Sequence, residues 1–187
     1  MANFIETQID ELRAVLESAK ALAPEIERAA LYASECINNG GTIFSCGNGG
    51  SAADAMHLAE ELSGRYKNNR KALRGLALNA DPTAITCIAN DFGYDNLFSR
   101  QLEAFGKAGD LLVLFSSSGN SKNQLNAIEQ AKQMGVKTFL VTGKSGGICK
   151  GKADFEIVVP SNTGARVQEV HTMVLHILIE YIEKNLK

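Results

Sequence analysis

A run of serines is the part of the sequence best suited to binding an anion. Residues 116–121 read Ser-Ser-Ser-Gly-Asn-Ser, after an apolar stretch and before a helix-forming one, so their hydroxyls and backbone N–H groups would lie at a helix N-terminus. The sequence has neither a Walker A motif nor G-x-G-x-x-G, which removes the main support for a nucleoside triphosphate or a dinucleotide. We therefore expect a single phosphate group here. A serine-rich turn that only caps a helix would have the same residues.

A glycine-rich loop, and two side chains on the helix after it, could hold the other end of such a ligand. Residues 46–51 read Cys-Gly-Asn-Gly-Gly-Ser, and three glycines in four positions are typical of backbone that closely approaches another group. His57 and Glu61 are four residues apart, so they would share one face of a helix. An ordinary surface helix also carries such pairs.

The last helix contains further candidates, which cannot all face one point. At about 100° per residue, Gln168 and His176 are about 80° apart and His171 and His176 about 140° apart. His171 is the more ordinary helix residue, but spacing does not decide which histidine joins the site. The run 173–179 is apolar on nearly every side, so we expect it to be buried, and the imidazole of His176 would then need a partner.

These residues require elements that bring them to one edge of a sheet. Apolar runs predict strands that alternate with amphipathic helices, which is typical of a parallel sheet covered on both faces. Ligands of such sheets bind beyond the carboxyl ends of the strands, where both loops would lie. The expected strands are 42–46, 73–78, 111–115, 136–141 and 155–159, and the expected helices are 5–22, 26–36, 51–62, 122–134 and 163–185.

Composition indicates one compact domain and excludes several classes of function. The chain has 187 residues, of which 45% are hydrophobic and 21% charged, and we expect one domain over residues 1–187, with N-terminal helices in 1–40 and an α/β core in 41–187. A net charge of −2 argues against binding nucleic acid or an anionic membrane. The absence of a membrane-span pattern or a signal-peptide pattern favours the cytoplasm. The four cysteines form no C-x-x-C pair and should be buried free thiols.

Several motifs occur together in the order found in one enzyme family. They are the glycine-rich loop followed by 54–57, then 60–66, 90–93, the serine run, 142–144, and 166–169 with His176. In this combination the sequence resembles the phosphoheptose isomerases. These are sugar isomerase (SIS) domain enzymes that convert sedoheptulose 7-phosphate to D-glycero-D-manno-heptose 7-phosphate, the first step of bacterial ADP- or GDP-heptose biosynthesis. The chain has Phe115, Ser117 and Ser145 where many members have Ile, Thr and Asp.

The resemblance implies a fold, an assembly and a set of site residues. The implied fold is a flavodoxin-like parallel sheet with helices on both faces, preceded by N-terminal helices. The implied assembly is a homotetramer whose subunits complete one another's active sites, with Glu61 and His176 as the acid/base pair and one zinc per subunit. The zinc ligands would be His57, Glu61, Gln168 and His176. The substrate-binding residues would be Asn48, Gly49, Gly50, Ser51, Glu61, Arg65, Asn90, Asp91, Ser116, Ser117, Ser118, Ser121 and Gln168.

The chemistry of such an enzyme needs few groups. A carbonyl moves between C2 and C1 through an enediol, which requires a base at carbon and proton transfer between two oxygens. Our hypothesis is that Glu61 takes the carbon-bound proton and His176 acts at the oxygens and in ring opening, although exchanged roles fit the sequence equally. Relatives with this architecture also act as non-catalytic sugar-phosphate sensors or as tetrameric replication-initiation partner proteins. The retained Glu61, Gln168 and His176 argue against those roles, and an isomerase of another ketose phosphate is the nearer alternative.

Overall fold

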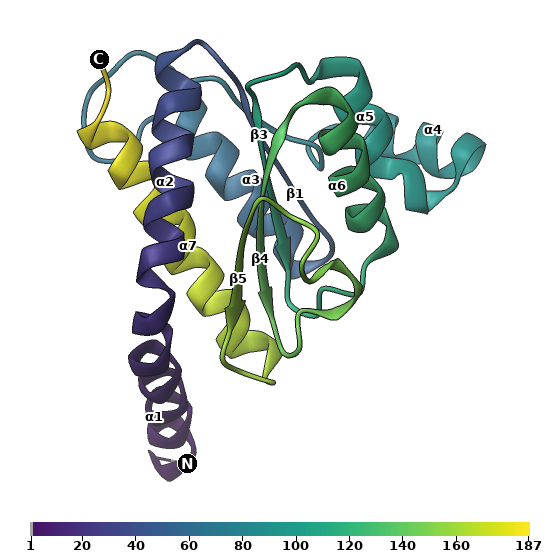
Figure 1. The fold of residues 1–187 in the computed structure, drawn as a ribbon. Helices are drawn as coiled ribbons and strands as arrows, with labels where there is room; N and C mark the ends of the chain where they lie inside the picture. The colour runs from purple at the N-terminus through teal and green to yellow at the C-terminus, as the bar shows by residue number, and fades with distance from the viewer. Residues whose placement is uncertain (1) are drawn as a thin grey trace.

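The fold is a parallel α/β sheet between two layers of helices, as the sequence predicted. The computed structural model describes residues 2–187 (Figure 1), in which five parallel strands lie in the order β2-β1-β3-β4-β5. This order is the flavodoxin-like one. The strands are β1 (Ile43–Gly47), β2 (Gly75–Ala77), β3 (Leu111–Ser116), β4 (Lys137–Gly143) and β5 (Phe155–Val159).

Alternating side chains of the strands divide the core into two halves. Val113 and Phe115 point to one face of the sheet, and Leu112 and Leu114 point to the other, because side chains alternate along a strand. The first face is covered by α2 (Ala23–Asn38), α3 (Gly50–Ser63) and α7 (Gly164–Lys184). The second face is covered by α5 (Leu97–Phe105) and α6 (Lys122–Met134), with α4 (Pro82–Phe92) partly packed beside them. The candidate residues on α3 and α7 therefore lie on the first face.

The N-terminal helix extends away from the sheet. Helix α1 (Ala2–Ala19) continues through the short 3-10 turn η1 (Lys20–Leu22) into α2, and its first half projects beyond the rest of the chain (Figure 1). Phe4, Ile5 and Ile9 are exposed there. Across residues 2–187, every helix is too short or too polar to cross a membrane.

Two helices were not predicted from the sequence. Helices α4 and α5 occupy a stretch for which no helix or strand was predicted, and they are joined by the 3-10 turn η2 (Tyr94–Asn96). The start of α4 has a recognisable signal, because Asp81 accepts hydrogen bonds from the backbone of Thr83 and Ala84, and Pro82 occupies the first turn. A further 3-10 turn, η3 (Gly147–Cys149), follows β4.

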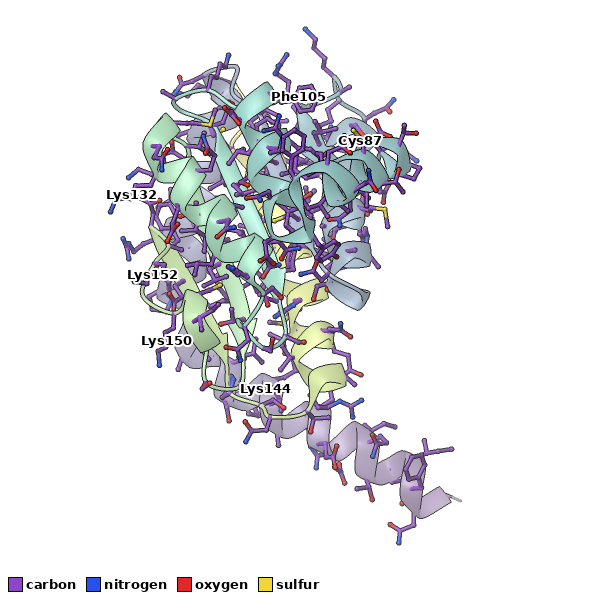
Figure 2. All side chains as sticks on the ribbon, turned by 90° about the vertical axis from the view of Figure 1, so that its right-hand side faces the viewer. Cys87, Phe105, Lys132, Lys144, Lys150 and Lys152 are labelled. Carbon is purple, nitrogen blue, oxygen red and sulfur yellow. The ribbon has the colours of Figure 1, made fainter. Side chains whose placement is uncertain are left out.

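Two expectations about burial are wrong. The run 173–179 is not buried on all sides, because Ile177 is 39% exposed and His176 is half-buried; the fully buried imidazole is that of His171. The cysteines are free but not all buried, since Cys87 is exposed on α4. Figure 2 shows Cys87 and Phe105 on the side that α4 and α5 cover.

Candidate functional site

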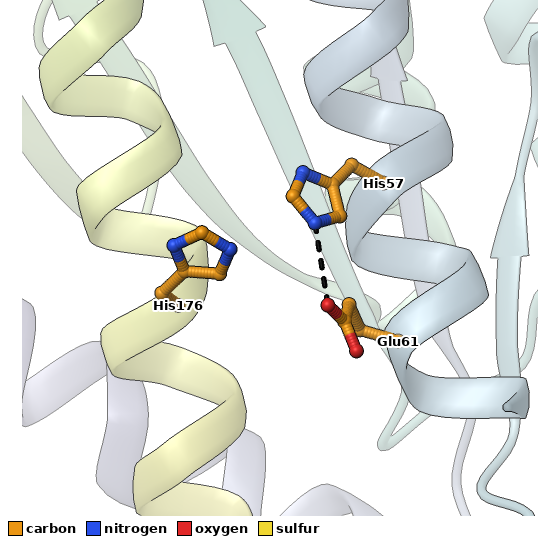
Figure 3. Close-up of side chains that lie close together, drawn as sticks. All are labelled: His57, Glu61 and His176. Carbon is orange, nitrogen blue, oxygen red and sulfur yellow. Dashed lines mark hydrogen bonds and ion pairs between the residues drawn. The ribbon is translucent and has the colours of Figure 1, made fainter. Parts of the chain in front are cut away.

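Three ionisable side chains from α3 and α7 converge on one point. His57 and Glu61 lie one turn apart on α3, and His57 Nε2 is 3.3 Å from Glu61 Oε1. His176 reaches the same point from α7, which lies beside α3 (Figure 3). Its ring centroid is 5.0 Å from that of His57, with the planes at 82°. The structure therefore places the two proposed acid/base residues, Glu61 and His176, together.

This cluster has the donors that a zinc ion requires. One ligand atom each from His57, Glu61 and His176 lies within 4.8 Å of the others. Two imidazole nitrogens and a carboxylate oxygen are typical zinc ligands at about 2.0–2.2 Å from the metal, so small side-chain movements would bring these atoms to their places around one ion. The three residues therefore fit the zinc ion that the family resemblance implies.

The fourth proposed ligand, Gln168, lies elsewhere in the same chain. Its amide Nε2 lies against Gly50 at the start of α3, where a methyl group added to the glycine would collide with it. Eight residues, or about 12 Å of helix, separate Gln168 from His176. Gln168 therefore lines the glycine-rich loop, and its closeness explains why position 50 favours glycine.

The glycine-rich loop is held by neighbouring side chains. Asn48 and Asn123 exchange two amide hydrogen bonds of 3.0 Å, and the Tyr94 hydroxyl donates to Asn48 Oδ1 at 2.8 Å. Gly49 has a φ of 58°, which favours glycine, and the buried Ser51 continues into α3. The loop lies at the carboxyl end of β1, as predicted.

The serine run forms a tight loop at the same edge of the sheet. Gly47 on β1 pairs with Phe115 on β3, so the two loops follow neighbouring strand ends. Ser116 Oγ accepts a hydrogen bond from Gly119, and the Gly119 carbonyl accepts one from Cys149, at 3.1 and 3.0 Å. Ser121 begins α6 and, within the described chain, makes no capping hydrogen bond with its side chain. Its hydroxyl and the helix N-terminus could therefore bind a phosphate.

The remaining proposed substrate-binding residues do not join either loop within one chain. Asn90 and Asp91 are exposed on α4, which packs with the second face of the sheet, whereas the histidine cluster lies on the first. They hydrogen-bond each other at 2.7 Å. Arg65 is exposed just after α3.

Sequence reasoning missed a buried polar pair behind the cluster. His171 Nδ1 lies 3.9 Å from Asp54 Oδ2, and Thr172 donates to Asp54 Oδ1 at 3.0 Å. Burial lowers the pKa of His171 to about 4, with the Thr142 backbone opposing the shift, and burial raises the pKa of Asp54. Because His171 is then neutral at pH 7, the pair is not an ion pair there. Spacing alone could not reveal this contact between α3 and α7.

The chain is similar to known proteins over nearly its whole length. A model of the SIS domain matches residues 8–143. A phosphoheptose isomerase of Vibrio vulnificus is 52% identical over 164 residues, covering 87% of this chain and 85% of that one. One of Campylobacter jejuni subsp. jejuni is 43% identical over 184 residues, covering 98% and 99%. The solved structure of a phosphoheptose isomerase from Francisella tularensis is 33% identical, covers 98% of both chains and has a TM-score of 0.93.

Proposed function

Because the chain belongs to the SIS domain family and, within it, to the phosphoheptose isomerases, we propose that Glu61 and His176 catalyse its reaction at a site shared between subunits. The protein is an isomerase, and its reaction is the interconversion of sedoheptulose 7-phosphate and D-glycero-D-manno-heptose 7-phosphate. The observation that carries the residue assignment is the convergence of Glu61, His57 and His176 within 4.8 Å.

The two groups are sufficient for the proton transfers of the reaction. Glu61 removes the proton from C1 of the ketose, which leaves a 1,2-enediol, and returns a proton to C2 to give the aldose. His176 moves the other proton between the oxygens on C1 and C2, so that atoms and charge balance. Triose-phosphate isomerase divides the same work between a glutamate base and a neutral histidine.

The metal would use residues that also transfer protons. His57, Glu61 and His176 would hold one zinc ion per subunit, and Gln168, the fourth ligand that the resemblance implies, would have to come from another subunit. When bound, zinc supplies a Lewis acid that polarises the carbonyl and neighbouring sugar oxygens. Because Glu61 and His176 would be ligands of the ion and also the proposed proton carriers, the two roles compete for the same side chains.

The phosphate would bind to the serine loop. Ser116, Ser117, Ser118 and Ser121 present hydroxyls, and the N-terminus of α6 adds backbone N–H groups and a partial positive charge. Asn48, Gly49, Gly50, Ser51 and Gln168 would contact the sugar.

Distances along α3 favour a site that two chains complete. Eleven residues separate Gly50 from Glu61, which corresponds to about 16 Å of helix. A phosphate on the serine loop and a sugar carbon at Glu61 of the same chain would be further apart than the substrate is long. We therefore propose that the loops of one subunit face Glu61 and His176 of another, with Arg65, Asn90 and Asp91 brought in by the assembly.

An apolar groove on α7 supports an interface between subunits of the proposed homotetramer. It has a volume of about 530 Å³ and lies between α7 and the α1–α2 segment. Ile177 and Met173 line it on one side, and Leu16 and Ile26 on the other. Exposed apolar surface of this kind is typical of subunit interfaces. The protein is proposed to be cytoplasmic, with a small sugar phosphate as its ligand and neither nucleic acid nor membrane as a partner.

Incubation with sedoheptulose 7-phosphate and detection of the aldose tests the reaction. We expect conversion of this substrate and little conversion of unphosphorylated sedoheptulose, since the serine loop would have nothing to bind. An absence of product, with a protein partner recovered instead, would favour the non-catalytic alternative.

Complementation tests the shared site. At a substrate concentration below KM, the Glu61→Gln and Ser118→Ala variants should each lose activity, and mixed tetramers should regain part of it if the two residues belong to different halves of one site. Mixed tetramers with no more activity than the separate variants would contradict a shared site.

A further inference from the structure

The segment that follows α3 places an aromatic ring against His176. The Tyr66 ring stacks on the His176 imidazole, with centroids 5.5 Å apart and planes at 17°. The edge-to-face contact with His57 restrains the same imidazole from another direction. The side chain of His176 is therefore held between two rings, of which only His57 belongs to the proposed metal site.

A buried carboxylate fixes the backbone that carries Tyr66. Glu183 lies seven residues after His176, so both project from the same face of α7. The Glu183 side chain is 2% exposed. It accepts hydrogen bonds from the backbone N–H groups of Tyr66, Lys67 and Asn68 at 3.4, 3.3 and 3.2 Å. These bonds fix the backbone position from which the Tyr66 ring reaches His176.

Arg70 connects the same carboxylate to the end of α3. Its Nε donates to Glu183 Oε1 at 2.9 Å, and its side chain is 7% exposed. Its Nη2 donates to the Glu61 carbonyl at 2.6 Å, and its Nη1 donates to the Leu62 carbonyl at 2.9 Å. Arg70 and Glu183 thus link the helix turn that carries Glu61 to the helix that carries His176.

A buried ion pair is a poor source of net stability, because desolvation offsets much of its attraction. The Arg70–Glu183 pair instead fixes geometry, since its hydrogen bonds reach the turn of Glu61 and the backbone of Tyr66. We propose that Tyr66 is a positioning residue for His176, and that the Arg70–Glu183 pair holds it in place. This inference rests on the proposed role of His176.

Substitutions at Tyr66 separate ring stacking from other effects. Tyr66→Phe keeps the ring, so kcat for sedoheptulose 7-phosphate should stay within about twofold of wild type. Tyr66→Leu removes the ring, so kcat should fall about 10- to 100-fold, because small displacements of reacting groups lower the rate by about this much. KM should change less than about threefold. A Tyr66→Phe variant as impaired as Tyr66→Leu, or a fully active Tyr66→Leu variant, would overturn the proposal.

Zinc affinity gives a readout that does not depend on turnover. Tyr66→Leu should weaken the binding of Zn²⁺ alone, measured by competition with a chromophoric chelator, about 10- to 100-fold, as is usual when a group that orients a ligand is lost. Tyr66→Phe should bind as wild type does. If the wild-type protein bound zinc but did not isomerise the sugar, the proposed function would fail. The zinc affinity would still test whether Tyr66 positions His176. Unchanged affinity in Tyr66→Leu would overturn the inference.

The carboxylates of α7 provide a matched pair of variants. Glu180 also pairs with the segment, through Lys67 at 2.6 Å, but at the surface. Glu180→Gln should leave kcat and zinc affinity unchanged, whereas Glu183→Gln should reproduce the losses of Tyr66→Leu. If Glu183→Gln does not fold, Arg70→Lys, which keeps the charge but loses the two-carbonyl contact, should show smaller losses in the same direction. Equal behaviour of Glu180→Gln and Glu183→Gln would contradict the role of the buried pair.

Discussion

The buried histidine behind the site predicts a specific dependence of stability on pH. The His171 imidazole is fully buried, and burial lowers its pKa from an ordinary 6.5 to about 4. The unfolded chain therefore binds a proton at this residue more readily than the folded chain does. Stability from this group is present above pH 6.5 and is lost as the pH falls toward 4.

The magnitude follows from the difference between the two pKa values. A difference of about 2.5 pKa units corresponds to about 3 kcal/mol over the whole range, of which about 2 kcal/mol falls between pH 7 and pH 5. Asp54 acts in the opposite sense, because its raised pKa favours the folded state at low pH. Asp54 is present in wild type and in a His171 variant, and His171 is not among the causes of its raised pKa, so a comparison of the two proteins separates the contribution of His171 from that of Asp54.

The experiment compares wild type with His171→Phe. The new apolar ring can pack against Phe115, whose ring centroid is 5.8 Å from that of the His171 imidazole. Urea unfolding at one protein concentration, with a chelator present, gives the free energy of unfolding at each pH without contributions from metal binding. Between pH 7 and pH 5, wild type should lose about 2 kcal/mol more than the variant. If His171→Phe does not fold, His171→Leu serves the same comparison. Parallel losses in wild type and variant would refute the assignment of a neutral, buried imidazole.

Three further predictions concern the proposed site. Glu61→Gln should lower kcat about 10²- to 10⁴-fold. The control, Glu60→Gln, removes an exposed carboxylate 3.9 Å from His57, and its kcat should stay close to that of wild type. Similar kcat values in the two variants would argue against Glu61 as the base. Ser118→Ala should mainly raise KM for the phosphorylated sugar, and an equal loss with unphosphorylated sugar would contradict phosphate binding. Gly50→Ala should impair activity by displacing the Gln168 amide, and a wild-type KM in that variant would show that the close contact is not needed.

The sheet could be predicted because its strands are almost wholly apolar. The ends of β5 and α6 agree with the bounds predicted from the sequence, and the other strands differ by a few residues. Helix α4 was missed because its apolar residues are interrupted by threonines, which weaken the helical pattern, and in the structure none of its residues is fully buried. Its Asp-Pro start was the usable signal.

The site could be predicted only within each helix. The spacing of His57 and Glu61 places them one turn apart, and the structure agrees. No spacing rule states which face of α7 meets α3, so the sequence left the choice between His171 and His176 open. Packing decides it, since His171 points into the core and His176 lies against His57 of α3. The stacking of Tyr66 was equally hidden, because it depends on a loop held by Glu183.

The direction of the helices explains why the loops and the histidine cluster lie apart within one chain. Helices α3 and α7 both start at the carboxyl edge of the sheet and run back along its first face, so each later residue is withdrawn from the loops by about 1.5 Å. Gln168 and Gly50 meet near the edge, while His176 and Glu61 meet about two to three turns further along. The glycine-rich loop and the histidine cluster, whose motifs are close in the sequence, are therefore separated along the helices within one chain. Since a sugar phosphate is shorter than that length, this separation is the reason that we propose a site completed by two chains.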